Sequence, residues 1–239
     1  MAVAQKLACQ VEQIIHHGEH VYTVELRPER PAPRFRPGQF LHLALDAYDP
    51  SGFWPESRVF SIANPPAQRE RLRITYSVQG RFTARMEREL AEGQQVWIKL
   101  PYGDFVVEDT SDVVLFAGGT GITAFSAFLD GLTPGFRRAV YLAYGARHRS
   151  LLIYRDMVEQ RVQLNPMLCA FYFIESVAGE LQPNELAGRL SASALWPRIQ
   201  NPSEATYYIS GPPPMLKAIS QDLRDRDIRT DAIRIDAWE

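Results

Sequence analysis

The chain has 239 residues, of which 46% are hydrophobic and 23% charged, and its formal net charge is −2. This length suits one large domain or two smaller ones, and the composition is that of a globular protein rather than a disordered one. The nearly balanced charge offers no general attraction to nucleic acid or to an anionic membrane.

The N-terminal half is predicted to form a small antiparallel barrel. Up to about residue 105, short alternating apolar runs are broken by glycine and proline, at residues 21–26, 39–45, 72–78 and 96–100. Such alternation is typical of half-buried strands. Residues 83–90 have helical composition, and this helix is expected to begin at Thr83 as its cap and to end before Gly93.

The C-terminal half is predicted to form an open parallel sheet with helices on both faces. Buried strands at residues 113–116, 139–144, 168–174, 206–209 and 233–235 alternate with helices starting near residue 122 and spanning about 150–162 and 214–226. Sheets of this kind bind ligands at the carboxyl ends of their strands. The boundary between the two halves is placed near residues 108–112.

The cysteine and histidine content limits the metal chemistry. Cys9 and Cys169 lie far apart in apolar, strand-like segments. Because an iron–sulfur cluster needs several closely spaced thiolates, we expect neither a ferredoxin domain nor a zinc site on this chain. His16, His17 and His20 crowd one N-terminal turn and are expected to face solvent.

The sequence also gives an expectation about location. No segment approaches the roughly 18 apolar residues that span a bilayer. Residues 1–6 lack the charged start and apolar run of a signal peptide. We therefore expect a soluble, cytoplasmic protein.

Three sequence blocks indicate the chemistry. Residues 58–64 read Arg-Val-Phe-Ser-Ile-Ala-Asn, residues 116–123 read Phe-Ala-Gly-Gly-Thr-Gly-Ile-Thr, and residues 209–215 read Ile-Ser-Gly-Pro-Pro-Pro-Met. An arginine beside an aromatic ring and a hydroxyl can hold a flavin, and a glycine turn after a buried strand admits a nucleotide phosphate. The order and spacing of the blocks resemble the ferredoxin–NADP reductase superfamily over nearly the whole chain.

The resemblance implies a two-domain fold. Residues 1–108 would form an N-terminal antiparallel six-stranded β-barrel that binds FAD. Residues 109–239 would form a C-terminal α/β parallel-sheet Rossmann-like domain that binds NAD(P). FMN in place of FAD is the less expected flavin.

The first block implies roles for residues of one barrel strand. In the family pattern Arg58 contacts the flavin phosphate, Phe60 the isoalloxazine face and Ser61 the ring edge near N5, with Val59 between them. Phe60 stands where the family usually has tyrosine. Taken alone, an Arg-x-aromatic-Ser run fits a cross-strand pair on a solvated face equally well.

Residues 76–83 resemble the family's second flavin block, which includes Tyr76 and Phe82. Backbone N–H groups at Gly80, together with the Thr83 hydroxyl, are expected to hold the pyrophosphate at a helix N-terminus. The alternative is that Gly80 simply ends a strand and Thr83 simply caps a helix.

The second and third blocks are expected to bind the dinucleotide. They resemble the family's Gly-Gly-Thr-Gly-Ile-Thr-Pro and Cys-Gly-Pro-x-x-Met, with Ala124 in place of the proline and Ser210 in place of the cysteine that meets the nicotinamide. Ser210 could instead bond local backbone at a strand end. The residues predicted to bind the dinucleotide are Gly119, Thr120, Gly121, Ile122, Gly211, Pro212 and Met215.

Trp238 is the candidate for an aromatic gate over the flavin. Members of the family often end with an aromatic ring that covers the flavin face which the nicotinamide must reach. The alternative is a tryptophan that only fixes the tail to the core.

The sequence gives mixed signals about NADH versus NADPH. A 2′-phosphate needs an arginine or a lysine, whereas a free ribose hydroxyl favours an acceptor. Basic residues that favour NADPH are Arg147, Arg149 and Arg189. Residues that disfavour a phosphate are Glu175, Val177 and Glu180, and they lead us to favour NADH.

The resemblance implies an FAD-dependent NAD(P)H oxidoreductase of the ferredoxin reductase type, with Ser61, Ser210 and Trp238 as the catalytic residues. Hydride would pass from NAD(P)H to bound flavin, and the electrons would leave to a separate ferredoxin, flavodoxin or oxygenase component. One alternative is a reductase that uses free flavin as a substrate. Another is an electron-transfer subunit without turnover of its own.

Overall fold

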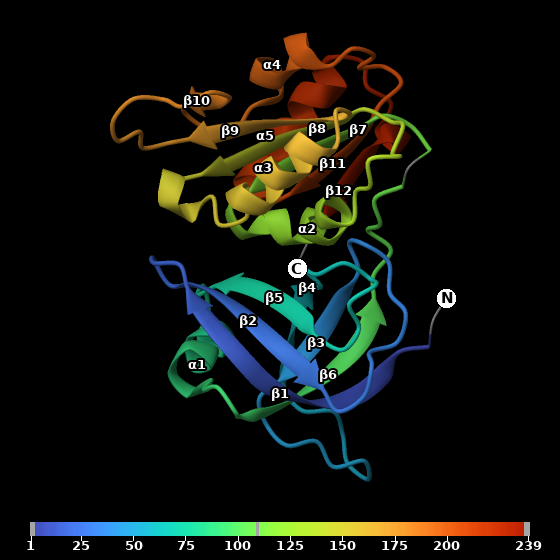
Figure 1. The fold of residues 1–239 in the computed structure, drawn as a ribbon, viewed down its shortest axis with the longest axis vertical. Coiled ribbons are helices and arrows are strands. Elements are labelled where there is room, and N and C mark those ends of the chain that lie inside the picture. Colours follow the sequence, from blue (N-terminus) through green and yellow to red (C-terminus); the bar gives the residue numbers. More distant parts are fainter. Residues whose placement is uncertain (1–2, 109, 237–239) are drawn as a thin grey trace. The chain divides into compact units, whose positions relative to one another are not determined.

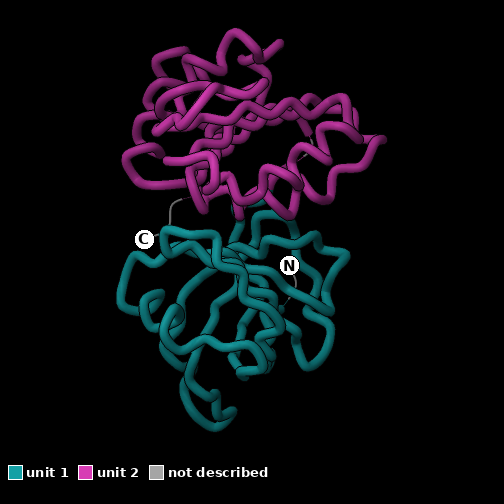
Figure 2. The backbone as a smooth tube through the Cα atoms, turned by 60° about the vertical axis from the view of Figure 1, so that its left-hand side comes forward, with its two compact units in different colours: residues 1–106 teal, residues 107–239 magenta. Residues whose placement is uncertain are grey.

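The computed structural model describes residues 3–108 and 110–236. The chain divides into two compact units, residues 1–106 and residues 107–239 (Figure 2). Each unit is built around one six-stranded sheet.

The first unit is a nearly closed antiparallel barrel, as the sequence predicted. Its strand order is β4-β3-β6-β1-β2-β5, and every neighbouring pair is antiparallel (Figure 1). The elements are β1 (Gln5–His16), β2 (Val21–Pro28), β3 (Phe40–Ala44), β4 (Ser57–Ser61), β5 (Leu72–Ser77), α1 (Arg81–Glu89) and β6 (Gln95–Tyr102).

The buried side chain of Asn64 joins the two terminal strands of this sheet. Its Oδ1 accepts from the Arg73 N–H at 2.8 Å, and its Nδ2 donates to the carbonyls of Gln68 at 2.7 Å and Arg71 at 3.1 Å. The Ala63 N–H, just after β4, donates to the Arg73 carbonyl in β5 at 2.8 Å. One amide side chain therefore satisfies backbone groups where the sheet would otherwise leave an edge.

The longest barrel strand, β1, was not among the predicted runs. Its register shifts between Val11 and Gln13, so the inward and outward positions do not alternate regularly along it. Leu7, Cys9 and Val11 point into the barrel core. Burial raises the pKa of the Cys9 thiol, which is therefore protonated and chemically inert at neutral pH.

Helix α1 begins two residues earlier than predicted, and the predicted cap was wrong. The N-cap is Gly80, and Thr83 occupies the third helical position. The Thr83 hydroxyl accepts from the N–H groups of Gln79 at 3.0 Å and Gly80 at 3.1 Å, as the third residue of a capping box does. Phe82 and Met86 from the same helix enter the barrel core.

The second unit is a parallel sheet with the order β10-β9-β8-β7-β11-β12, which confirms the predicted class. Its strands are β7 (Val113–Gly118), β8 (Val140–Ala146), β9 (Leu168–Ile174), β10 (Glu185–Ala187), β11 (Thr206–Ser210) and β12 (Ile233–Asp236). Its helices are α2 (Thr123–Asp130), α3 (Arg155–Leu164), α4 (Ala192–Leu195) and α5 (Pro213–Asp225). The short β10 and α4 were not predicted, because three or four residues give no periodic signal.

The helices of this unit cover both faces of its sheet (Figure 1). Helices α4 and α5 pack on one face, where Leu195 and Leu223 share a core with Phe116 and Tyr207. Helices α2 and α3 pack against each other and form the other layer. None of the described helices is both long and apolar enough to cross a membrane.

Candidate functional site

The parallel sheet has one topological switch point, and it lies between β7 and β11. From β7 the chain proceeds outward through β8, β9 and β10, whereas β11 and β12 extend the sheet in the opposite direction. The connections that leave β7 and β11 therefore diverge at the carboxyl ends of adjacent strands. This is the position where open α/β sheets bind nucleotides.

The two turns at the switch point are interlocked through glycine. A Cβ added to Gly118 would lie 2.5 Å from the Met215 sulfur, and one added to Gly121 would lie 2.4 Å from the Ser210 carbonyl oxygen. A Cβ on Gly211 would meet Met215 Cε at 2.8 Å. A side chain at Gly121 would force the two turns apart, because the atoms it meets are backbone, whereas one at Gly118 or Gly211 would first displace the Met215 side chain.

Gly119 differs from the other glycines of this turn. Its φ of 54° is left-handed, and a Cβ added to it would meet nothing within 4 Å. Gly119 begins a single turn of 3₁₀ helix, Gly119–Ile122, that leads into α2. Open space beside a backbone turn at the start of a helix suits the approach of a phosphate group.

Ser210 forms a buried hydrogen bond with Asp236 at the same end of the sheet. The two residues are register partners on β11 and β12, and the Ser210 hydroxyl donates to Asp236 Oδ2 at 2.9 Å. Both side chains are buried. Because the hydroxyl proton is directed to the carboxylate, the lone pairs of Ser210 Oγ are what this side chain offers to a further ligand.

Sequence reasoning singled out Ser210 and missed Asp236. The available signal was a carboxylate directly after the predicted strand at residues 233–235. The other predicted residue of this C-terminal stretch, Trp238, lies outside the described residues.

The barrel block lies on β4 and beside the first turn of α1. Arg58 is exposed, and its guanidinium carbon lies 5.4 Å from the centre of the Phe82 ring. Phe60 is buried in the barrel core with its ring 6.0 Å from that of Tyr76, while Ser61 is buried on the opposite face of the strand. Val59, on the same face as Ser61, is half-buried.

Tyr76 and Phe82 are core residues of the barrel. Both are buried, and Tyr76 also stacks on Tyr22 with ring centres 5.4 Å apart. Desolvation raises the pKa of Tyr76, so its phenol stays neutral. Their packing role is established, and the flavin contacts predicted for them remain predictions.

Glu56 bridges two arginines at the start of α1. Its carboxylate lies 3.1 Å from Arg81 and 3.7 Å from Arg58. Nothing lies within 4 Å of a Cβ built on Gly80, the N-cap between β5 and the helix. Two guanidinium groups and an open helix N-terminus together form an arrangement that can bind an anion. The sequence pointed to Arg58 and Gly80 but not to Arg81.

Two of the three arginines considered for the 2′-phosphate, Arg149 and Arg189, are engaged with carboxylates. Arg149 binds Glu185 through two hydrogen bonds of 2.8 Å and also donates to the Glu180 carbonyl at 2.8 Å. Arg155 forms a second short contact with the fully buried Glu185 carboxylate. The exposed Arg189 lies 3.5 Å from Glu175.

The Arg149 guanidinium, the Gln182 N–H and Arg155 together hold the pKa of Glu185 down to about 2. Its carboxylate is therefore charged throughout the neutral range. Sequence reasoning had missed Glu185, because the strand β10 that it begins spans three residues and carries no pattern.

The N-terminal histidines do not all face solvent, contrary to the expectation from the sequence. His16 and His20 are exposed, but His17 is partly buried, and its Nε2 lies 2.9 Å from the Thr23 hydroxyl. Burial lowers the pKa of His17. Within residues 3–108 and 110–236, no cluster of three or more His, Cys, Asp or Glu side chains is arranged to hold a metal ion.

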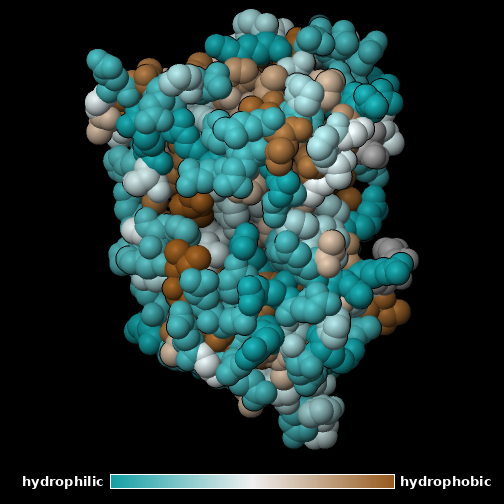
Figure 3. Space-filling model, viewed as in Figure 1, coloured by the Kyte–Doolittle hydropathy of each residue, from teal (hydrophilic) through white to brown (hydrophobic). Residues whose placement is uncertain are grey.

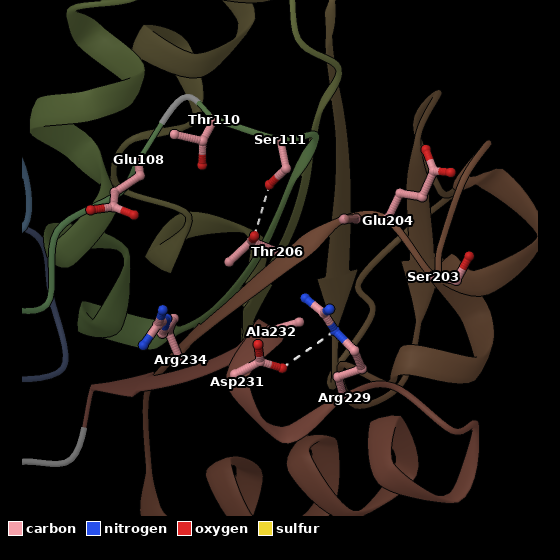
Figure 4. Close-up of a pocket in the computed structure, with 11 residues that line it drawn as sticks. Glu108, Thr110, Ser111, Ser203, Glu204, Thr206, Arg229, Asp231, Ala232 and Arg234 are labelled. Atoms are coloured by element: carbon pink, nitrogen blue, oxygen red, sulfur yellow. Dashed lines mark hydrogen bonds and ion pairs between the residues drawn. The ribbon is translucent and has the colours of Figure 1, made fainter.

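A polar cavity of about 470 Å³ lies at the opposite, amino-terminal edge of the parallel sheet (Figure 4). Ser111 and Thr206, at the starts of β7 and β11, contact each other across it at 2.7 Å, and Arg229 pairs with Asp231 at 3.3 Å. Since nucleotides bind at the carboxyl ends of parallel strands, this cavity is not the dinucleotide site.

The fold combines an antiparallel barrel with a parallel α/β sheet whose switch-point turns suit a nucleotide. Residues 115–221 match the family model of the oxidoreductase NAD-binding domain. The reductase component DmpP of phenol 2-monooxygenase from Pseudomonas sp. (strain CF600) is 28% identical over 200 residues, which cover 82% of this chain and 55% of that protein.

Solved structures agree over the whole chain. The Amycolatopsis cytochrome P450 reductase GcoB has a TM-score of 0.84 at 21% identity, covering 98% of this chain and 70% of that one. A ferredoxin NADP+ reductase from Neisseria gonorrhoeae with bound FAD and NADP has a TM-score of 0.76 at 20% identity, covering 98% of both chains. These matches confirm the predicted fold, and residues 115–221 match the oxidoreductase NAD-binding domain.

The chain spans about half the length of the first two curated relatives that match it, with shares of 55% and 49%. Further relatives are named as reductase or electron transfer components of dioxygenases.

Proposed function

We propose that the chain is an FAD-dependent NADH oxidoreductase that passes electrons to a separate protein acceptor. The observation that carries this proposal is the switch point of the parallel sheet. There, two interlocked glycine turns leave Gly119 open beside the buried Ser210–Asp236 pair. The barrel at residues 1–108 serves as the FAD-binding domain, and residues 109–239 serve as the NAD(P)-binding domain.

The barrel residues fit a flavin dinucleotide. Arg58, Arg81 and the first-turn N–H groups after Gly80 offer donors to a pyrophosphate, which would displace Glu56 from the two arginines. Thr83 fixes this helix start through its own backbone contacts. On β4, Ser61 would supply the ring-edge contact, whereas the ring-face contact predicted for Phe60 would require its ring to leave the barrel core.

The parallel sheet fits a dinucleotide. A Cβ built on Gly119 meets nothing within 4 Å, which leaves space for a phosphate beside this turn, while Met215 and Pro212 pack against the neighbouring Gly118. Ser210 orients the nicotinamide by accepting a hydrogen bond from its carboxamide, because Asp236 takes the hydroxyl proton. When bound, FAD accepts a hydride from the nicotinamide and releases the electrons singly, while the protein aligns the two rings.

The dinucleotide is NADH. Arg149 and Arg189, two of the three arginines predicted to favour a 2′-phosphate, are paired with Glu185 and Glu175. The 2′-phosphate of NADPH would be repelled by the carboxylates that already bind these arginines. The free 2′-hydroxyl of NADH could instead donate a hydrogen bond to a carboxylate.

The electron acceptor is a separate protein, and this part of the proposal is supported by relatives named as reductase or electron transfer components of oxygenases. A location in the cytoplasm remains a prediction from the sequence.

The test is the absorption spectrum of the purified protein under anaerobic conditions, with NADH and NADPH in parallel cuvettes. We expect flavin bands that NADH bleaches at least tenfold faster than NADPH. A colourless protein that oxidises NADH after flavin is added would support the free-flavin reductase instead. Bound flavin that neither nucleotide reduces would contradict the proposal.

A further inference from the structure

An aromatic surface with two lysines covers part of the outer face of the barrel. We call it the aromatic–lysine surface. Its strand residues point away from the core on β1, β3 and β6, and residues 45–56 fold over them. Its members are Lys6, Phe40, His42, Tyr48, Phe53, Trp54, Trp97, Lys99 and Tyr102.

The two lysines form an unfavourable pair in the barrel sheet. Lys6 on β1 and Lys99 on β6 are direct register partners, and like charges placed directly opposite each other destabilise a sheet. Their ammonium groups lie 5.9 and 5.8 Å from the centre of the same Trp54 ring. Lys6 also lies 4.3 Å from the Tyr48 ring and Lys99 5.2 Å from the Tyr102 ring. The ring faces offset part of the repulsion, but they do not neutralise either charge.

No carboxylate balances these charges in the part of the chain that the structure describes, where neither lysine forms an ion pair. The acidic residues of the overlying loop have other partners. Those partners are Arg85 for Asp46 at 2.6 Å, Ser51 for Asp49 at 2.7 Å and Arg81 for Glu56 at 3.1 Å. Lys6 donates a hydrogen bond to the Tyr48 hydroxyl at 2.5 Å, but this contact leaves its charge in place. A pair of like charges without a balancing carboxylate is a local conflict of the kind found at functional surfaces.

An exposed aromatic ring lies on the same loop. The Phe53 side chain is fully exposed, whereas Trp54 next to it is half-buried and donates to the Ser57 hydroxyl at 3.0 Å. The face drawn in Figure 3 is mostly hydrophilic with scattered apolar side chains. A rigid ring that projects into solvent is the kind of residue that anchors protein interfaces.

We propose that the aromatic–lysine surface docks an acidic electron-acceptor protein, whose carboxylates pair with Lys6 and Lys99 while an apolar residue packs against Phe53. This inference rests on the proposed reductase function. It also explains why the uncompensated charges are retained, since transient electron-transfer complexes form by electrostatic steering. Anionic membranes are recruited by clusters of four to eight basic residues, whereas this surface carries two lysines.

Zero-length cross-linking with a carbodiimide tests the surface without any turnover. This reagent joins a partner carboxylate to a lysine amine, and Lys6, Lys99 and Lys217 are the lysines of the chain. The probe is an acidic [2Fe–2S] ferredoxin incubated with the full chain at low ionic strength. We expect peptides joined through Lys6 or Lys99. Cross-links confined to Lys217, or none above the background found at high salt, would overturn the proposal.

Kinetics provide the second test. A double variant, Lys6→Gln with Lys99→Gln, is compared with Arg137→Gln and Arg138→Gln, two residues of the second unit whose loss changes the net charge equally. At low salt the lysine variant should reduce the ferredoxin about three- to tenfold more slowly, with a shallower salt dependence. Its rate with the basic protein cytochrome c should not fall. Equal effects of the two double variants would refute a specific docking surface.

The outcomes separate this inference from the proposed function. Cross-links at Lys6 or Lys99 in a protein that does not oxidise NADH would reject the reductase function and retain the surface. A different result would identify a membrane as the partner of this surface. In that case the chain would sediment with anionic phospholipid vesicles, the Phe53→Ser variant would not, and no ferredoxin cross-links would form. A Phe53→Ser variant that keeps its fold should weaken the ferredoxin complex.

Discussion

Replacing Glu185 with glutamine should shift the preference between NADH and NADPH. The Glu185 carboxylate engages Arg149 through two hydrogen bonds and is fully buried. Glutamine has nearly the same shape, but it carries no charge and accepts through one oxygen. A hydrogen bond to a charged group contributes about 1.5–3 kcal/mol, so releasing Arg149 towards a 2′-phosphate should improve NADPH binding about tenfold or more.

The same substitution should reduce stability in a pH-dependent manner. Because Arg149 lowers the pKa of Glu185 to about 2, its stabilisation is present above the unfolded-state pKa of about 4.3 and is lost as pH falls towards about 2. The Glu185→Gln variant should be about 2 kcal/mol less stable at pH 7, and its difference from the wild type should shrink in acid. Urea unfolding between pH 3 and pH 7 measures this difference.

The assay for cofactor preference is kcat/KM for NADH and NADPH, measured on wild type, Glu185→Gln and the control Glu204→Gln. Glu204 is exposed at the opposite edge of the sheet, so its loss changes the net charge without freeing Arg149. We expect the NADPH-to-NADH ratio to rise in Glu185→Gln and to stay constant in the control. A folded Glu185→Gln variant with an unchanged ratio would refute the assignment of Arg149 as the sequestered phosphate ligand.

Three further substitutions test other parts of the structure. Gly121→Ala places a Cβ 2.4 Å from the Ser210 carbonyl oxygen, so this variant should lose NADH binding in titration calorimetry. A variant that binds NADH with wild-type affinity would show that the two turns can separate freely. Asn64→Ala removes the buried amide and leaves three backbone groups without it, so the free energy of unfolding in urea should fall by about 2–4 kcal/mol. A decrease below about 0.5 kcal/mol would contradict the role of Asn64 in closing the barrel. Lys99→Glu would place a carboxylate opposite Lys6 on the neighbouring strand, and the thermal unfolding midpoint measured by calorimetry should rise by a few degrees. A lower midpoint would contradict a repulsion between Lys6 and Lys99.

The sequence predicted the parallel sheet more completely than the barrel, for a physical reason. The strands of the parallel sheet are buried on both faces and read as continuous apolar runs, such as Leu168–Ile174, whose predicted and observed bounds coincide. The bulge in β1 breaks the two-residue period that identifies a strand. The start of α1 was misplaced because Thr83 resembles a cap but acts at the third helical position.

The residues of the candidate site were also only partly predictable from the sequence. Motif residues such as Gly119 and Ser210 could be recognised because their types and spacing are specific. Their partners could not, since Asp236 and Glu185 gain their roles from strand pairing and tertiary contacts that leave no local pattern. Likewise, the sequence suggested that the glycines admit a ligand, whereas Gly118, Gly121 and Gly211 mainly admit the neighbouring turn.

Glu56 acts as a resident counter-ion for the arginines beside α1. Its single carboxylate lies between Arg58 and Arg81 and offsets part of their mutual repulsion. A phosphate that arrives there exchanges with a carboxylate instead of filling an uncompensated positive site. The net affinity of an anion for this site is therefore set by the difference between two anions that compete for the same pair of cations.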